Sequence, residues 1–487
     1  MHTLTLFNSL TRQLEPFQPV HDGEARVYTC GPTVYNYPHI GNMRAYVFAD
    51  VLGRTLSYKG YKLTHVINIT DVGHLTDDAD AGEDKMEKMA AERAQSIWDI
   101  ARHYTEAYWA DIKALNIREP AKWSIATDYV PQMIDFAKSI ADKHCYELDS
   151  GLYFDVSTVA DYARLAGRNT QDQIEEDQSA WMRIDPVKDK RNAADFAIWR
   201  KTPPGEKRQM EWDSPWGKGA PGWHLECSVM SGDLLGFPFD IHTGGIDHRE
   251  IHHPNEIAQN QAFCCTNGLD LPANSGARVW MHNNFLVERS GKMSKSSGEF
   301  LRLQLLIDKG YHPLAYRMMC LQAHYRSELE FSWEGLGAAL TRLKRMLMAA
   351  ERLADVEAGE ARHQKLAPML DAFDKAMSED LNTPVALTAL EDVLSAKKVD
   401  PSAKRAAVEL MDGVLGVRLF DMARADLRIR PKAAEISESE IEDVLARRKQ
   451  ARADKDFAAS DALRDELAAR GIEVMDGDPL GWEWKLG

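Results

Sequence analysis

The chain has 487 residues, of which 44% are hydrophobic and 28% charged, so it is globular in composition and too long for one hydrophobic core. Six cysteines are too few for a disulfide-stapled fold, and no apolar run approaches the roughly 18 residues of a membrane helix. The N-terminal residues lack the features of a secretory signal, so we expect a cytoplasmic protein without a membrane partner. The net charge of −16 disfavours non-specific nucleic-acid binding but allows a local basic path for a selected RNA.

The N-terminal segment predicts the opening unit of a parallel sheet. After a first strand in residues 1–8, a second strand is expected over residues 26–32. Residues 45–59 carry apolar side chains at helical spacing until Gly60, and residues 62–70 have the composition of a further strand. Strand, glycine-bearing turn, helix and strand in this order are typical of a doubly wound α/β domain.

The rest of the chain changes character several times. Residues 116–220 combine helical segments with polar, tryptophan-rich pieces and are predicted to be an insertion. This insertion splits a catalytic domain formed by residues 1–115 and 221–310. A helical period continues over residues 311–425, and residues 426–487 predict helices followed by a strand. The predicted fold class is therefore α/β: a Rossmann-like doubly wound parallel sheet split by an insertion, then an α-helical bundle and a small C-terminal α+β module.

Two short motifs give the first functional signal. Residues 291–298 (GKMSKSSG) place Lys292 and Lys295 among small residues, and residues 38–42 (PHIGN) follow an apolar, aromatic segment. Either motif alone is ordinary, because lysines on a polar loop are usually just solvated and a His-x-Gly is common by chance. In this order and at this separation they resemble the two signature sequences of class I aminoacyl-tRNA synthetases, which activate amino acids with ATP. The chain departs from that signature at Asn42, where the class has a second histidine.

Cysteines and histidines that are distant in the sequence suggest a second kind of site. Cys30, Cys227 and residues 248–256 (HREIHHPNE) offer thiolate, imidazole and carboxylate groups, which suit Zn²⁺. Their spacing is not that of a zinc finger, so two buried cysteines and a polar helix start are the simpler alternative on spacing alone.

Helix geometry leaves the choice of ligands in residues 248–256 open. His252 pairs at four-residue spacing with either His248 or Glu256, and His253 pairs with Glu256 at three-residue spacing. Pro254 is expected in the first helical turn, where it needs no N–H donor. That placement predicts His252 just outside the helix and Glu256 within its first turn.

Three segments narrow the resemblance to one family. Residues 30–35 (CGPTVY), 223–227 (WHLEC) and 252–256 (HHPNE) resemble the zinc-holding segments of cysteinyl-tRNA synthetases, and the similarity extends along almost the whole chain. The resemblance implies one Zn²⁺ per chain with the ligands Cys30, Cys227, His252 and Glu256. It also implies that the metal binds the substrate thiolate and that no editing domain is needed, since an apolar pocket separates small side chains by only about 1–3 kcal/mol. Whether Glu256 stays on the metal when cysteine binds is left open.

The same resemblance implies the groups that activate cysteine. The cysteine carboxylate attacks the α-phosphorus of ATP and pyrophosphate leaves, so catalysis depends on positioning and charge stabilisation rather than on a protein nucleophile. The implied catalytic residues are His39, Asn42, Lys292 and Lys295. The implied ATP-binding residues, with Mg²⁺ held mainly by the phosphates, are His39, Gly41, Asn42, Gly244, Gly245, Asp247 and Lys295. The implied cysteine-binding residues are Gly31, Thr70, Trp223 and His242.

The C-terminal part resembles the anticodon-binding portion of this family. The resemblance implies a monomer that binds L-cysteine, ATP and tRNA(Cys), with anticodon contacts from Arg452, Asp461 and Asp476. Each of these three is otherwise an ordinary surface charge. One alternative is a ligase of the same ancestry that joins activated cysteine to an amino sugar (mycothiol type), which is expected to lack this portion. A second is a non-catalytic tRNA-binding paralogue, which is expected to have lost a lysine or a metal ligand.

Overall fold

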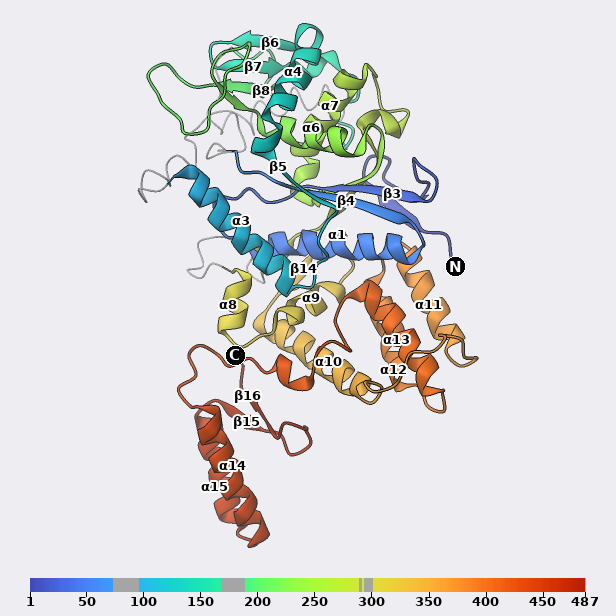
Figure 1. The fold of residues 1–487 in the computed structure, drawn as a ribbon, viewed down its shortest axis with the longest axis vertical. Helices are drawn as coiled ribbons and strands as arrows, with labels where there is room; N and C mark the ends of the chain where they lie inside the picture. Colours follow the sequence, from blue (N-terminus) through green and yellow to red (C-terminus); the bar gives the residue numbers. More distant parts are fainter. Residues whose placement is uncertain (73–95, 168–188, 289–290, 293–300, 487) are drawn as a thin grey trace.

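The computed structural model describes residues 1–72, 96–167, 189–288, 291–292 and 301–486. Figure 1 shows an elongated molecule with the central sheet between a smaller domain and a set of helices, and a pair of helices at the far end. Within the described residues, none of the helices has both the length and the apolar character that a bilayer-spanning segment requires.

A five-stranded parallel sheet, in the order β11-β10-β3-β4-β5, forms the centre of the molecule. Its strands in chain order are β3 (Glu24–Thr29), β4 (Lys62–Ile69), β5 (Lys122–Ile125), β10 (Phe239–Gly245) and β11 (Ala277–Asn283). The chain runs one way from β3 to β4 and β5, and returns on the other side of β3 as β10 and β11. The carboxyl ends of β3 and β10 therefore meet at the topological switch point, where doubly wound sheets bind ligands. The predicted α/β fold class is confirmed.

Helices cover both faces of this sheet (Figure 1). α1 (Ile40–Tyr58) and α3 (Ile97–Ala114) lie on one face, and α6 (Trp223–Leu235) and α7 (His252–Cys264) lie on the other. The N-terminal hairpin of β1 (Thr5–Asn8) and β2 (Gln13–Pro16) lies against β11, where the Ser9 N–H donates to the Trp280 carbonyl at 2.8 Å.

One strand of the central sheet lies in residues that the sequence assigned to the insertion. β5 pairs in parallel with β4 from Val66–Lys122 to Ile69–Ile125, so the sheet continues past the predicted limit at residue 115. This strand was not predicted because its four residues, Lys-Trp-Ser-Ile, are too few to show a clear alternation of apolar and polar side chains. The sheet within the insertion is antiparallel and packs with α4 (Val130–His144); its strands are β6 (Cys145–Leu148), β7 (Gly151–Phe154), β8 (Phe196–Lys201) and β9 (Gly219–Pro221).

The part after the sheet is helical, as predicted. A three-stranded sheet of β12 (Leu286–Glu288), β13 (Gly291–Lys292) and β14 (Leu329–Phe331) precedes and interrupts it. The helices are α8 (Leu303–Asp308), α9 (Pro313–Leu321), α10 (Trp333–Glu351), α11 (Ala367–Ser378), α12 (Thr383–Ser395) and α13 (Pro401–Leu415). Asn382 caps α12 by accepting from the Val385 N–H, which explains the break in the helical pattern there.

Charged side chains that are buried between elements attach this bundle to the sheet domain. Asp50 on α1 accepts from Arg317 on α9 and from Arg54, each at 2.7 Å, and from the Arg118 N–H at 3.0 Å. Arg317 is fully buried and also donates to the Leu415 carbonyl at the end of α13. The bundle is therefore held in a fixed position against the helix that follows β3.

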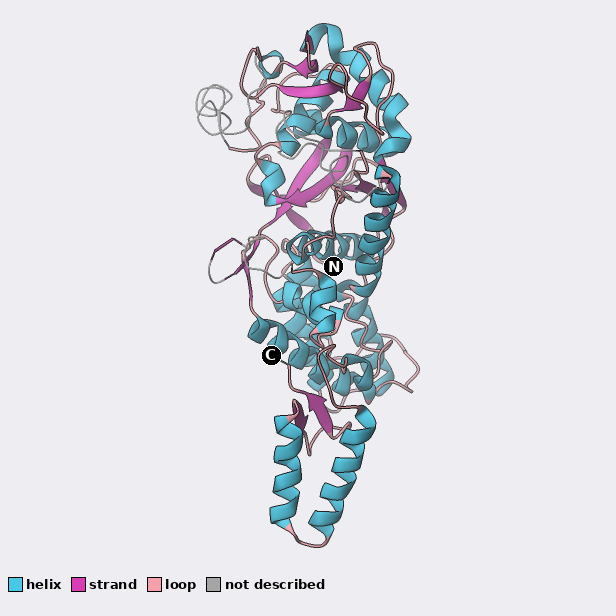
Figure 2. Ribbon diagram, turned by 90° about the vertical axis from the view of Figure 1, so that its left-hand side faces the viewer, coloured by secondary structure: helices cyan, strands magenta, loops and turns pink. Residues whose placement is uncertain are grey.

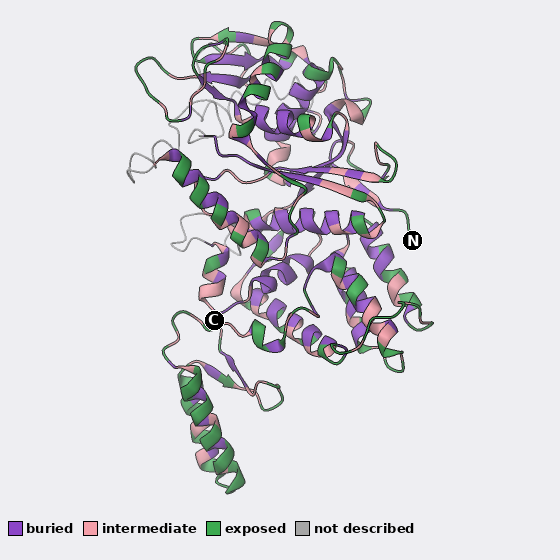
Figure 3. Ribbon diagram, viewed as in Figure 1, coloured by how far each residue is buried: buried purple, intermediate pink, exposed green. Residues whose placement is uncertain are grey.

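The C-terminal module consists of an antiparallel helix pair and a short hairpin (Figure 2). Its elements are α14 (Glu438–Ala453), α15 (Phe457–Ala469), β15 (Ile472–Val474) and β16 (Trp482–Trp484). Most of the helix surface is exposed to solvent, in contrast to the buried central sheet (Figure 3). The projection has a small core of its own, which includes Ile441, Val444 and Leu467, and its hairpin meets the bundle at the base.

Ion pairs join the base of the module to the bundle. Glu483 accepts from Lys344 on α10 and from Arg424, each at 2.6 Å, and Arg424 also donates to Asp478 at 3.1 Å. All four side chains are mostly buried.

The substitution Arg424→Met is expected to loosen the module selectively, because it leaves two buried carboxylates with one cation fewer. Breaking a buried ion pair in this way costs about 3–5 kcal/mol. Hydrogen exchange should show faster opening of β15 and β16 with unchanged protection in the central sheet. As a control, Arg342→Met removes a half-exposed pair with Glu391 and should cost under about 1 kcal/mol. Equal effects of the two substitutions would argue against this role for Arg424.

Candidate active site

Three elements that are far apart in the sequence bring four candidate metal ligands together at the carboxyl edge of the sheet. Cys30 follows β3, Cys227 lies on α6, and His252 and Glu256 lie at the start of α7. Cys30 Sγ is 3.9 Å from Cys227 Sγ and 3.8 Å from Glu256 Oε1, and His252 Nε2 is 3.1 Å from Glu256 Oε1. All four side chains are buried, and their ligand atoms lie within 4.8 Å of one another. These are the four ligands that the family resemblance implies.

The donor set fits a zinc ion. Two thiolates, an imidazole and a carboxylate are typical zinc ligands, and bonds of roughly 2.0–2.3 Å in a tetrahedron place ligand atoms roughly 3.3–3.8 Å apart. The distances from Cys30 Sγ to Cys227 Sγ and to Glu256 Oε1 match this spacing, and the distance from His252 to Glu256 is slightly shorter. A small tetrahedral ion can therefore be held with little movement of these side chains.

The charges of the four groups suit a cation. Burial opposes the carboxylate of Glu256, but His242 and His252 outweigh burial and lower its pKa to about 2. Burial also opposes a charged His252, yet its hydrogen bonds to Cys227 and Glu256 raise its pKa to about 10. The hydrogen bond from Cys30 lowers the pKa of Cys227. The ionised carboxylate of Glu256 is thus available to a cation at this site.

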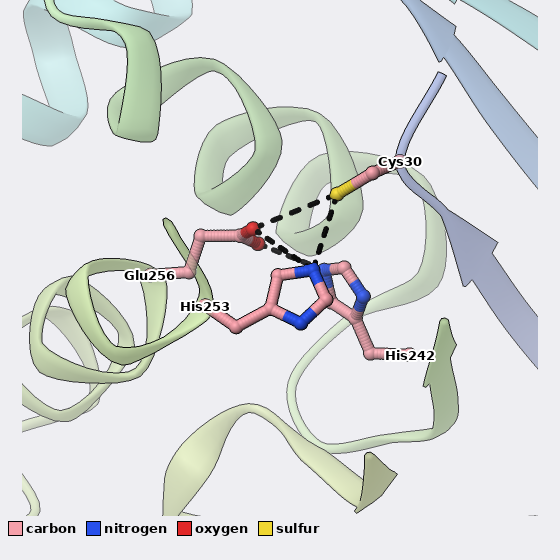
Figure 4. Close-up of side chains that lie close together, drawn as sticks. All are labelled: Cys30, His242, His253 and Glu256. Atoms are coloured by element: carbon pink, nitrogen blue, oxygen red, sulfur yellow. Dashed lines mark hydrogen bonds and ion pairs between the residues drawn. The ribbon is translucent and has the colours of Figure 1, made fainter. Parts of the chain in front are cut away.

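An alternative ligand set shares two of the four residues (Figure 4). The ligand atoms of Cys30, His242, His253 and Glu256 also lie within 4.8 Å of one another. Cys30 Sγ is 3.3 Å from His253 Nε2, and His242 Nε2 is 2.8 Å from Glu256 Oε2. Glu256 thus lies between the two sets, with Oε1 near His252 and Oε2 near His242. Geometry allows one ion in either of two neighbouring positions.

The start of α7 differs from the sequence-based prediction. The helix begins at His252, with Ile251 as its N-cap residue, so His252 lies inside the first turn and not just outside it. Pro254 is in the same turn, as expected. The prediction was wrong because none of the first four N–H groups of a helix has a partner within the helix, so proline fits at several of these positions. His252 and Glu256 consequently face the same side at four-residue spacing.

Two further histidines at the site were missed from the sequence. His224 Nδ1 is 2.9 Å from His252 Nδ1, and His282 Nε2 is 2.8 Å from His253 Nδ1. His282 Nδ1 is in turn 2.8 Å from the Ser9 hydroxyl. Such contacts fix the tautomer and orientation of imidazoles that face a metal. His282 stands alone in strand β11, and no motif marks it.

The predicted cysteine-binding residues surround these ligands. The Trp223 ring lies 4.4 Å from that of His252, and His242 contacts Glu256. Gly31 directly follows Cys30, and the Thr70 hydroxyl accepts from Asn68 Nδ2 at 3.0 Å at the end of the neighbouring strand. The structure therefore brings all four predicted residues to one edge of the sheet.

His39 and Asn42 together form the N-terminal cap of α1. His39 Nδ1 accepts from the Gly41 N–H at 3.1 Å, and Asn42 Oδ1 accepts from the His39 N–H at 3.2 Å. Because Nδ1 is the acceptor, a neutral His39 ring carries its proton on Nε2, where it can donate to a phosphate. An asparagine supplies the acceptor that this reciprocal cap requires, so the departure from the class signature at Asn42 is compatible with an intact helix start.

The predicted adenosine segment closes strand β10. A side chain at Gly244 would bring its Cβ to 2.7 Å from the buried ring of His253, so that position requires glycine, whereas at Gly245 the nearest atom is the end of the exposed Asp247 side chain. Asp247 follows in a 3₁₀ turn, Ile246–Arg249, and is the exposed residue of that turn. The backbone of Lys292 lies in β13, whereas Lys295 lies outside the described residues.

The predicted anticodon residues lie in the C-terminal module. Asp476 accepts two hydrogen bonds from Arg448, at 2.8 and 3.1 Å, and lies 3.3 Å from Arg452 Nη1. Asp461 on α15 pairs with Arg464 at 3.6 Å. The structure joins Arg452 and Asp476 directly, and Phe457 at the tip of the helix pair adds an aromatic side chain that is 64% exposed.

Two family models match the chain. The description of the first is tRNA synthetases class I (C) catalytic domain, and it covers residues 16–341. The second is the Cysteinyl-tRNA ligase anticodon binding domain, over residues 437–479.

Solved structures share the fold at low sequence identity. A methionyl-tRNA synthetase from Mycobacterium tuberculosis, bound to methionyl-adenylate, superposes with a TM-score of 0.51 at 13% identity, covering 81% of this chain and 90% of that one. The LeuRS of Agrobacterium radiobacter, in a ternary complex with tRNA, gives a TM-score of 0.55 at 11% identity, covering 82% of this chain and 84% of that one. These similarities bear on the fold alone.

Full-length relatives identify the family. A cysteine–tRNA ligase from Novosphingobium aromaticivorans is 78% identical over 486 residues, covering 99% of this chain and 97% of that protein. One from Zymomonas mobilis is 52% identical over 513 residues, covering 98% and 97%. The chain therefore belongs to the cysteine–tRNA ligase family, a family of ligases among the class I tRNA synthetases.

Proposed function

We propose that the protein attaches L-cysteine to the 3′ end of tRNA(Cys). Cysteine and ATP form cysteinyl-adenylate and pyrophosphate, and the activated cysteine is then transferred to the tRNA. The observation that carries the proposal is the convergence of Cys30, Cys227, His252 and Glu256 at the carboxyl edge of the sheet. Such a set of soft and borderline ligands suits a substrate that itself carries a thiol.

Cysteine is selected at these four ligands, which would hold one Zn²⁺ per chain. When bound there, the ion supplies a Lewis acid whose bond to a thiolate has no equivalent for serine or alanine. Trp223, packed on His252, forms an apolar wall of the pocket. His242 holds Oε2 of Glu256 at 2.8 Å and thereby orients that carboxylate. Gly31 has no side chain, so its turn can lie directly against the end of β4, where a Cβ would meet the Asn68 carbonyl oxygen.

ATP is placed against the start of α1 and the end of β10. The His39 Nε2–H and the positive end of the helix stabilise charge on the phosphates, and Asn42 keeps the helix start in place. Gly244 and Gly245 let the adenosine approach the strand end, where Asp247 accepts from ribose hydroxyls. Lys292 and Lys295 follow the charge on the pyrophosphate as it leaves, and Mg²⁺ accompanies the nucleotide.

Two alternative functions could use the same site, and experiments can distinguish them from tRNA charging. A ligase that joins cysteine to an amino sugar would share the metal ligands and the ATP motifs, but the match of residues 437–479 to an anticodon-binding model favours tRNA. A non-catalytic paralogue would not form the adenylate. Cysteine-dependent ATP–pyrophosphate exchange tests the activation step, and charging of a tRNA(Cys) transcript beside amino-sugar ligation tests the acceptor. Absence of both products would refute the proposal.

Arg452→Gln is expected to raise the KM for tRNA about tenfold, because unpaired bases are read by single side chains worth about 1–3 kcal/mol each. ATP–pyrophosphate exchange, which needs no tRNA, should be unchanged. Arg447→Gln is a matched control, since Arg447 is an exposed arginine on the same helix, α14. If both substitutions raise the KM for tRNA equally, Arg452 contributes only general charge and the anticodon assignment is wrong.

A further inference from the structure

A buried asparagine joins two of the residues proposed to line the cysteine pocket. Asn68, on β4, is 1% exposed. Its Oδ1 accepts from the Gly31 N–H at 2.7 Å, and its Nδ2 donates to the Thr70 hydroxyl at 3.0 Å. The Asn68 side chain thus holds the Gly31 N–H, after β3, and the Thr70 hydroxyl, after β4.

The turn after β3 is tightly fitted to the end of β4 at this point. The Thr70 N–H donates to the Pro32 carbonyl at 3.0 Å, and the Val34 N–H donates to the Thr70 carbonyl at 3.1 Å. A Cβ on Gly31 would come within 1.5 Å of the Asn68 carbonyl oxygen, so no other residue fits there. Both the main chain and the side chain of Asn68 therefore contact the backbone of this turn.

The direction of the Thr70 hydroxyl follows from these contacts. Because Asn68 Nδ2 donates to it, the hydroxyl proton points away from Asn68. The hydroxyl can therefore donate only to a group on the side away from Asn68.

Cys30 is held independently of Asn68. Its N–H donates to the Thr243 carbonyl on β10 at 3.1 Å, and its sulfur lies among Cys227, His253 and Glu256. Loss of the Asn68 side chain should therefore disturb Gly31 and Thr70 while it leaves the metal ligands in place.

We propose that Asn68 is a positioning residue for the substrate cysteine. It sets the Gly31 main chain and the Thr70 hydroxyl at a fixed distance from Cys30. Cysteine is small, so when its sulfur lies beside Cys30 its amino and carboxylate groups lie against this turn and Thr70. This inference rests on the proposed function. It identifies Asn68 as the side chain that positions Gly31 and Thr70 in the cysteine pocket.

The test compares Asn68→Leu, Thr70→Val and the double variant in cysteine-dependent ATP–pyrophosphate exchange. Asn68→Leu keeps the number and branching of the side-chain heavy atoms and removes both hydrogen bonds, so the KM for cysteine should rise about tenfold. The KM for ATP should stay within about twofold, and the zinc content should stay at one ion per chain. Because Asn68 acts partly through Thr70, the double variant should lose less than the product of the two single effects.

Two further variants keep the test decisive. Asn68→Asp keeps the acceptor for Gly31 but turns the Thr70 hydroxyl towards itself, so it should raise the KM for cysteine even if Asn68→Leu fails to fold. Thr383→Val is the matched control, since it removes a buried hydroxyl that donates to the Leu321 carbonyl at 2.8 Å in the helical bundle. It should leave both KM values unchanged.

The inference is wrong if the Asn68 variants raise the KM for ATP as much as that for cysteine, if they lose zinc, or if the Asn68 and Thr70 effects multiply fully. Each of these results would indicate a general structural role. Failure of the proposed function is a separate result, because the unmodified protein would then show no cysteine-dependent exchange at all.

Discussion

Cys227→Ser is expected to abolish retention of zinc and to lower cysteine-dependent ATP–pyrophosphate exchange by about 100-fold or more. A serine hydroxyl is a poor replacement for a thiolate ligand, and loss of residues that only orient a ligand already costs about 10–100-fold in metal affinity or activity. Cys227 Sγ lies 3.9 Å from Cys30 Sγ, which is close enough for both sulfurs to bind one ion. Zinc per chain, measured by elemental analysis after dialysis, is the direct readout.

The same experiment decides between the two ligand sets. Cys227 and His252 belong to one set, and His242 and His253 belong to the other. His253→Asn is the companion variant, because His253 is as buried as Cys227 and, like His252, lies on the first turn of α7. We expect His253→Asn to retain zinc. Retention of zinc by Cys227→Ser together with its loss from His253→Asn would contradict the assignment of Cys227 and His252.

His39→Asn is expected to lower kcat for adenylate formation by about 10²–10³-fold, with little change in thermal stability. Removal of one donor that stabilises developing charge typically has an effect of this size. Asparagine is among the best N-cap residues, so it can replace the acceptor that His39 Nδ1 presents to the Gly41 N–H. It does not supply a donor at the position of Nε2. The substitution therefore separates the catalytic role of the ring from its structural role.

His39→Ala is the companion variant. It removes both the donor and the cap, so it should lose a similar factor in kcat and about 1 kcal/mol of stability in addition. Zinc content should be normal in both variants, since His39 is not a ligand in either set. If His39→Asn keeps its kcat and only His39→Ala is impaired, then His39 acts through the helix start alone and its proposed contact with ATP is wrong.

The sequence named four candidate ligands but could not predict how they are arranged. Cys30 and Cys227 are 197 positions apart and come together only because β3 and α6 meet at the carboxyl edge of the sheet. No rule based on sequence spacing predicts this contact, so Cys30 and Cys227 could be selected only through the family motifs. Within residues 248–256, helical periodicity left three pairs of candidate ligands open. In the structure the helix begins at His252, one residue earlier than predicted, and His252 and Glu256 face each other.

Long, periodic elements were predicted well and short ones poorly. α1 and α10 have apolar faces over several turns, whereas β5 has four residues and belongs to the central sheet only through its pairing with β4. Contacts that depend on tertiary structure were not predictable either. The pairing of His282 with His253, and the bridge that Asn68 makes between Gly31 and Thr70, join residues from different elements and leave no local pattern.

The most direct measurement is the affinity of the metal-free protein for cysteine. Zinc is removed with a chelator, retention of the fold is checked by circular dichroism, and the Kd of L-cysteine is measured by calorimetry before and after zinc is restored. Selection through the metal predicts a Kd at least about 100-fold weaker without zinc, full recovery on addition of one equivalent, and no comparable effect on the binding of ATP. An unchanged Kd for cysteine in the metal-free, folded protein would contradict it.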